Sequence, residues 1–192
     1  MKKISLIIAI FSTVLTNAQD TWAFDASHST VGFSISHMVI SEIDGNFNKF
    51  EGSLSSSKDD LSDASINFTI DVASIDTADK KRDAHLLAAD FFDVVNHPEI
   101  SFKSTSISKK NDADYTLIGQ LTMHGFTKEI KLSMQYGGTI KDPWGNIKAG
   151  IKITGKLNRT AYGLTYNSVM EAGGLMIGED IEILCKMELI KK

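Results

Sequence analysis

The 192-residue sequence predicts an all-β protein, an antiparallel barrel of about eight strands with one short helix, around residues 82–93, in a crossover between two strands. Three observations predict this fold. Apolar and polar residues alternate with a period of two over most of the chain, which is typical of strands with one buried face. Short turns separate most of the alternating segments. One segment, residues 77–96, lacks the alternation and interrupts the series of strands.

The alternation defines the strands in order. "TVGFSISHMV" places Val31, Phe33 and Ile35 on one face. "DYTLIGQLTM" and "KEIKLSMQY", joined by the short "HGFT", predict a hairpin, and "DPWGN" has the Asp, Pro and Gly of a turn. The expected strands lie near residues 21–25, 30–39, 43–54, 65–74, 99–107, 114–123, 128–136, 147–157 and 180–190.

The inner faces of these strands suggest a barrel with room inside. Small residues occupy three inward positions, Gly119, Ala149 and Gly155. Eight strands enclose either packed side chains or one small ligand. We expect the small residues to leave volume for a cavity, the alternative being that they relieve crowding at bends. The large apolar residues expected to line the cavity are Phe33, Ile35, Phe68, Ile70, Phe102, Leu132, Met134 and Ile153.

Residues 77–96 are predicted to contain the helix. Their apolar residues recur at roughly helical spacing. Thr77 or Asp79 can cap the first turn, and Pro98 begins the next strand, where its missing N–H is tolerated. A helix here would cover a barrel mouth or an open sheet edge. We therefore expect Phe91 and Phe92 to pack on the apolar interior or on a ligand.

The first 18 residues predict a secretory signal peptide. The basic "MKK" precedes an apolar run of 12 residues, and "TNA" offers small residues before cleavage after Ala18. The alternative, a membrane anchor, needs about 20 apolar residues. We therefore expect a periplasmic or secreted protein without stable membrane insertion, with one domain over residues 19–192.

The net charge and the single cysteine argue against nucleic acid binding and against an internal disulfide. Removal of residues 1–18 takes away two lysines and no acid, so the net charge of −4 becomes −6. An acidic chain without a block of basic residues disfavours nucleic acid as a partner. The single Cys185 has no partner for an internal disulfide, and the alternation places it among apolar residues.

The residues that could carry chemistry form no recognised catalytic motif. Asp90, Asp93 and His97, near one barrel mouth, are candidates for a hydrolase or isomerase site on a lipid-like substrate, which is the alternative to a binding protein. The histidines lack the sequence spacing of metal ligands, so we expect no metal or cofactor and expect them to bond loops at strand ends. They are His28, His37, His85, His97 and His124.

Four polar residues are candidates for contact with a ligand headgroup at the barrel mouth: Arg82, Asn158, Arg159 and Tyr162. A guanidinium group matches the geometry of phosphate and carboxylate. The alternative is that Arg159 lies in a loop and pairs with a surface acid.

Separated motifs, in order, carry a family resemblance from Trp22 to the last strand. They are "WAFDASHSTVGFSISHM", "DGNFNKFEG", "ASIDTADKKRDAHLLAADFFDVVNHPEISFKS", "GQLTMHGFTKEIKL" and "LNRTAYGL" followed by "IGEDIEI". On these motifs the chain resembles the YceI-like proteins, a family of secreted bacterial proteins that bind lipids or polyisoprenoids. The resemblance implies a lipocalin-like barrel with an elongated apolar cavity. It also implies non-enzymatic binding or carriage of a long isoprenoid lipid, either a polyprenyl phosphate or a prenylated quinone.

Two further points stay open at this stage. A protein-interaction module with an exposed apolar patch is a third hypothesis, which would show a filled barrel instead of a tunnel. The oligomeric state is also undetermined, with a homodimer as one option.

Overall fold

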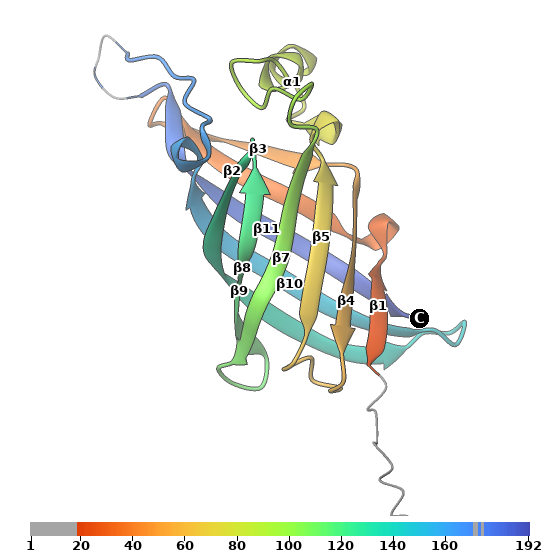
Figure 1. The fold of residues 1–192 in the computed structure, drawn as a ribbon. Helices are drawn as coiled ribbons and strands as arrows, with labels where there is room; N and C mark the ends of the chain where they lie inside the picture. Colours follow the sequence, from red (N-terminus) through yellow and green to blue (C-terminus); the bar gives the residue numbers. More distant parts are fainter. Residues whose placement is uncertain (1–18, 171–172, 174) are drawn as a thin grey trace, which may run out of the picture.

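The computed structural model describes residues 19–170, 173 and 175–192, and the expected signal peptide lies outside them. The described chain forms a closed, eight-stranded antiparallel barrel with one short α-helix beyond one end (Figure 1), which confirms the predicted fold class. The strand segments are β1 (Asp20–Phe24), β2 (Thr30–His37), β3 (Ser41–Phe47), β4 (Phe50–Ser56), β5 (Ser65–Asp71), β6 (Ile75–Asp76), β7 (Glu99–Lys109), β8 (Asp114–Met123), β9 (Phe126–Lys141), β10 (Ile147–Asn158) and β11 (Ile177–Lys191).

Three of the eight barrel strands consist of two segments each. Both β1 and β2 pair with β11, with Trp22 opposite Lys191 and Val31 opposite Cys185. The next barrel strand consists of β4, which pairs with β1, and β3, which pairs with β2. The strand after it consists of β5, which pairs with β4, and β6, which pairs with β3. A short 3-10 helix, η1 (Ala26–His28), separates β1 from β2. The pairing of β1 with β11 closes the barrel.

Side chains fill one end of the barrel, which we call the closed end. The loop of residues 57–64, between β4 and β5, crosses this end, and the side chain of Leu61 is 0% exposed. The Tyr115 hydroxyl donates to the Asp60 carbonyl oxygen at 2.6 Å, and the Tyr136 hydroxyl donates to the Asp59 carbonyl oxygen at 3.1 Å. These bonds hold the loop on the barrel. The side chains buried nearby include Leu54, Leu117, Met134 and Leu189.

The small inward residues do not create the free volume that we expected of them. A Cβ on Gly119 would lie 2.5 Å from Cζ of Phe102, and a Cβ on Gly155 would lie 2.3 Å from Cδ2 of Leu132. Large neighbouring side chains therefore already cover both glycines. Ala149 is buried in the packed core. The alternative reading, that small residues relieve crowding, describes Gly119 and Gly155 correctly.

The opposite, open end carries the segment that connects β6 to β7, residues 77–98, here called the crossover segment. Its helix α1 runs over Lys80–Leu86, so the predicted span of 82–93 was too long and began too late. Asp79 caps α1 by accepting hydrogen bonds from the N–H groups of Lys81 and Arg82, at 2.9 and 3.2 Å. Tight turns replace the helix after Leu87, and at Asp93 φ is +48°.

None of the helices in the described part of the chain is long and apolar enough to span a bilayer.

Candidate functional site

A cavity of about 810 Å³ extends from the middle of the barrel to the open end. Its walls are apolar side chains from strands on all sides and from the crossover segment. Asp79 and Lys81, which are exposed to solvent, also border it, so the cavity reaches the surface beside α1. A volume of this size is within the usual range of small-molecule sites, about 300–1,000 Å³.

The structure places most of the sequence-predicted site residues on this cavity. Those that line it are Phe33, Ile35, Phe68, Ile70, Arg82, Phe91, Phe92, Phe102, Leu132, Ile153 and Arg159. They come from five different strands, the crossover segment and the short helix η3 (Arg159–Tyr162). The alternation identified the inward side of each strand, and the cavity lies on that side.

Three of the predicted residues do not line the cavity. Met134 is two residues beyond Leu132 on β9, toward the closed end, and packs in the core opposite Tyr115. Asn158 caps η3 instead: its Oδ1 accepts from the Thr160 N–H at 2.9 Å. Tyr162 is buried, and its hydroxyl has no hydrogen-bond partner among the described residues. Alternation predicts the face of a strand, whereas the depth along the barrel depends on register.

Arg82 borders the cavity with its guanidinium already engaged. Its Nε donates to Oγ1 of Thr77 at 2.7 Å, and an Nη donates to the Thr77 carbonyl oxygen at 2.6 Å. The same Thr77 hydroxyl donates to Oδ1 of Asp83 at 2.5 Å. These bonds connect the first turn of α1 to the residue that leaves β6. Arg82 therefore positions the helix over the open end.

Arg159 is the one cavity-lining cation that is fully buried in the described structure, at 1% exposed. Its Nε donates to the Gly178 carbonyl oxygen at 2.8 Å, and Nη1 donates to the Leu164 carbonyl oxygen. Nη2 is buried without a hydrogen-bond partner among the described residues. Burial lowers the pKa of the guanidinium, with Glu179 acting in the opposite direction. An arginine nevertheless stays protonated, so the cavity wall carries a charge with unused donor capacity.

Sequence reasoning missed an aromatic group at the open end. The rings of Phe91 and Tyr166 have centroids 5.0 Å apart, and the ring of His85 lies edge-on to both, at 5.3 and 4.8 Å. Nε2 of His85 also contacts Oδ2 of Asp90 at 3.0 Å. All three rings border the cavity. Tyr166 lies 75 positions after Phe91 in the sequence. No local sequence pattern therefore predicts that Tyr166 lies next to Phe91 and His85.

Another lining residue, Cys185, lies on β11 beside Ile183. It is buried, and burial raises the pKa of its thiol to about 11. This buried position agrees with the expectation that Cys185 packs among apolar residues in the interior. The thiol faces the cavity, where a bound molecule would cover it.

The three candidate catalytic residues do not meet inside the cavity. Asp90 is exposed and pairs with His85. Asp93 and His97 lie together, but neither borders the cavity. The enzyme alternative required these groups to converge at one hydrogen-bonded point in the interior, and the structure does not provide that geometry.

Comparison with known proteins identifies relatives of the chain. The family model for the YceI-like domain matches residues 22–189. A UPF0312 protein of Staphylococcus aureus (strain USA300) is 33% identical over 168 residues, which cover 87% of this chain and 95% of that protein.

Solved structures of YceI proteins share the fold of this chain. The Campylobacter jejuni YceI protein superposes with a TM-score of 0.71 at 28% identity, covering 82% of this chain and 90% of that one. A polyisoprenoid binding domain from Saccharophagus degradans superposes with a TM-score of 0.66 at 14% identity, covering 89% of this chain and 98% of that one. The family match and the shared barrel agree with the resemblance carried by the motifs. The chain belongs to the YceI-like family.

Proposed function

We propose that this protein binds and carries a long isoprenoid lipid, such as a polyprenyl phosphate or a prenylated quinone, without chemical change. The observation that carries the proposal is the cavity itself, which has about 810 Å³ of volume and an almost wholly apolar wall. The polyisoprenoid-binding domain of Saccharophagus degradans has the same fold, which supports this ligand class.

The apolar wall suits a hydrocarbon chain. Each methylene removed from water contributes about 0.8 kcal/mol, so a five-carbon isoprene unit contributes roughly 4 kcal/mol before the cost of ordering the chain. A few buried units therefore provide useful affinity without a polar recognition motif. Branched and aromatic side chains such as Phe68, Phe102 and Ile183 offer contact along the full depth of the cavity.

Arg159 offers a fixed polar contact for the headgroup of such a ligand, in addition to the apolar contacts of the tail. Its free Nη2 donor can bind an oxygen of a phosphate headgroup or of a quinone ring. Because the guanidinium is held by two carbonyl oxygens, it does not have to be ordered when the ligand arrives. The guanidinium group of Arg82 is bound to Thr77. In this proposal Arg82 therefore supports α1, and Arg159 is the main contact for the headgroup.

The signal-like residues 1–18 support a site of action in the periplasm or outside the cell, where a carrier would shield an apolar tail from water. A secreted form begins at residue 19 in this proposal. N-terminal sequencing of the protein recovered from the periplasm or medium tests the cleavage after Ala18.

Native mass spectrometry of the purified protein, followed by lipid extraction, tests the proposal. We expect a bound mass that yields a prenyl lipid on extraction. Ile183→Trp should abolish this mass, because Ile183 lines the cavity and the larger side chain would fill it. Leu184→Trp is the matched control, since Leu184 is the next residue on β11 and is 40% exposed.

Two outcomes would contradict the proposal. One is empty protein in repeated preparations that also takes up no prenyl lipid when it is offered. The other is equal lipid occupancy in the Ile183→Trp and Leu184→Trp proteins, which would place the lipid outside the barrel.

A further inference from the structure

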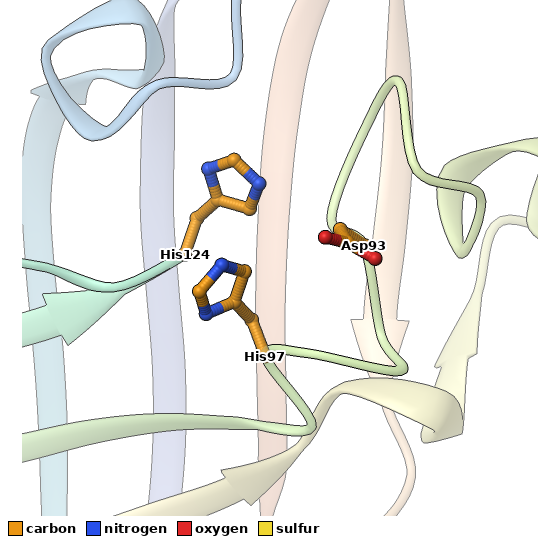
Figure 2. A group of neighbouring side chains, drawn as sticks. All are labelled: Asp93, His97 and His124. Atoms are coloured by element: carbon orange, nitrogen blue, oxygen red, sulfur yellow. The ribbon is translucent and has the colours of Figure 1, made fainter.

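Three side chains that can bind a metal converge at the rim of the open end. Asp93 and His97 belong to the crossover segment, and His124 begins the turn between β8 and β9. Each offers one ligand atom, and these atoms all lie within 4.8 Å of one another. Figure 2 shows the two imidazole rings one above the other, with the Asp93 carboxylate beside them. None of the three borders the lipid cavity.

The imidazole ring of His124 is oriented as a metal ligand would be. Its Nδ1 lies 3.2 Å from the Tyr162 carbonyl oxygen, which can only accept, so Nδ1 carries the proton of this bond. That tautomer leaves the lone pair of Nε2 free. A ring N–H bound to a backbone carbonyl is the usual support of a metal-ligating histidine. The ring also packs on Gly163, where an added Cβ would lie 2.9 Å from Nδ1.

The other two ligands are held by short local bonds. The Asp93 carbonyl oxygen accepts from the N–H of His97 at 2.8 Å, and the ligand atoms of the two side chains lie within 4.8 Å of each other. Oδ2 of Asp93 accepts from Nδ2 of Asn96 at 2.8 Å, which leaves the second carboxylate oxygen available. The His97 ring packs against Gly125, where a Cβ would lie 3.0 Å from its Cε1. The His97 and His124 ring centroids are 4.6 Å apart.

Two of the three possible metal ligands have an uncommon backbone conformation. Asp93 and His124 both have positive φ, +48° and +51°, which side chains other than glycine seldom adopt. The two residues belong to different segments, and Figure 2 shows the Asp93 carboxylate to one side of the two imidazole rings. Both ligands are therefore placed by conformations that cost energy and that the surrounding turns maintain.

We propose that Asp93, His97 and His124 form a binding site for a divalent transition-metal ion, with Zn²⁺ the best match, which fastens the crossover segment to the barrel rim. Two imidazoles and a carboxylate are a common three-ligand set for zinc, with water in the fourth position. Ligand atoms of a tetrahedral zinc ion lie roughly 3.4 Å apart, as bond lengths of about 2.1 Å require. Small rotations of the three side chains bring atoms now within 4.8 Å to that spacing.

A metal ion at this site would affect the wall of the cavity, because its ligands adjoin residues that line the cavity. Phe92 directly precedes Asp93, and Met123 directly precedes His124, and both line the cavity. A bound ion would connect two segments whose neighbouring residues form the cavity wall. The crossover segment would then open less often. This inference stands independently of the proposed lipid function, because metal binding is measured without any lipid.

The test uses the full secreted chain and Co²⁺, whose visible absorption reports tetrahedral nitrogen and oxygen ligands, with Zn²⁺ titrated by calorimetry. We expect one equivalent of Co²⁺ to bind and Zn²⁺ to displace it. His97→Gln, His124→Gln and Asp93→Asn should each weaken the affinity by roughly tenfold or more, since even an indirect support of a metal ligand contributes that factor. Hydrogen exchange at residues 88–97 and 124–125 should slow when Zn²⁺ is added.

His28→Gln is the control, because His28 belongs to a second histidine–carboxylate group, with Asp25 and Glu188, beyond the cavity. It should leave Co²⁺ binding unchanged. Binding that is lost in His28→Gln and kept in His97→Gln would assign the ion to that other group and overturn the proposal. Absence of Co²⁺ and Zn²⁺ binding by the folded wild-type protein would overturn it as well, and would leave the paired histidines as packing between two turns.

Discussion

The two ends of the barrel are built from the same strands and differ in what crosses them. At the closed end the loop of residues 57–64 inserts Leu61 and is bound by the hydroxyls of Tyr115 and Tyr136. At the open end the crossover segment lies over the strands and leaves a cavity of about 810 Å³ below it. A barrel of eight strands permits both arrangements. The comparison shows that the connections, more than the strands, decide where the interior is packed and where it is hollow.

The largest effect should come from a truncation at the closed end. Leu117→Ala removes a fully buried side chain from a packed region and should lower the free energy of unfolding by about 2–5 kcal/mol. Ile130→Ala, on the partner strand β9, should cost less, because Ile130 lines the cavity and its truncation enlarges that cavity instead of opening a new one in packed core. Urea unfolding of both variants measures the difference. Equal costs would mean that the two ends are packed alike.

Removal of the buried charge should mainly change ligand selection. Arg159→Met should reduce the affinity for a polyprenyl phosphate by roughly tenfold to a hundredfold, as expected for a lost charge-assisted hydrogen bond of about 1.5–3 kcal/mol. The affinity for the uncharged polyprenol should change less. Fluorescence displacement with both lipids measures the ratio. Lys156→Met, which removes an exposed lysine paired with Asp180, is the control, and an equal loss with both variants would refute this role for Arg159.

A smaller effect is expected from the crossover segment. Phe92→Ala removes a ring that lines the cavity and contacts Phe47, with centroids 6.3 Å apart. It should speed lipid release about fivefold, the factor that corresponds to roughly 1 kcal/mol. Stopped-flow transfer of lipid to acceptor vesicles measures the rate. Val95→Ala, at an exposed position of the same segment, should leave the rate unchanged, and an unaltered rate in Phe92→Ala would limit Phe92 to structural packing.

The smallest effect concerns the pH dependence of the closed end. Hydrogen bonds from Ser56 and Ser57 lower the pKa of Asp63 from 3.8 to about 2. A lowered carboxyl pKa in the folded state contributes stability above the unfolded-state value, and this contribution is lost as the pH falls from about 4 to 2. Asp63→Asn should therefore flatten the loss of stability in this window. Thermal unfolding between these pH values tests it, with the exposed Asp112→Asn as control, and an unchanged slope in Asp63→Asn would contradict the assignment.

Much of the fold and of the cavity wall was predictable because strand alternation is a local property. The inward positions of Phe33, Phe68 and Phe102 follow from a period of two, and each lines the cavity. Met134 has the same alternation as Leu132 but packs at the closed end, because depth along the barrel is set by pairing register. The helix was predicted in the correct crossover, but its bounds were wrong. It ends early because the turns after Leu87 are stabilised by bonds such as Phe92 N–H to the Leu86 carbonyl oxygen.

The sequence by itself determined the all-β class, the interrupting helix and the apolar inner faces, because each depends on residues that are near neighbours in the chain. Only the tertiary structure decided which end of the barrel is hollow, how Arg159 is buried with an unused donor, and that His97 and His124 meet. These features join residues from different strands and turns. They depend on barrel closure and register, which are set by the sum of many long-range contacts and not by any local pattern.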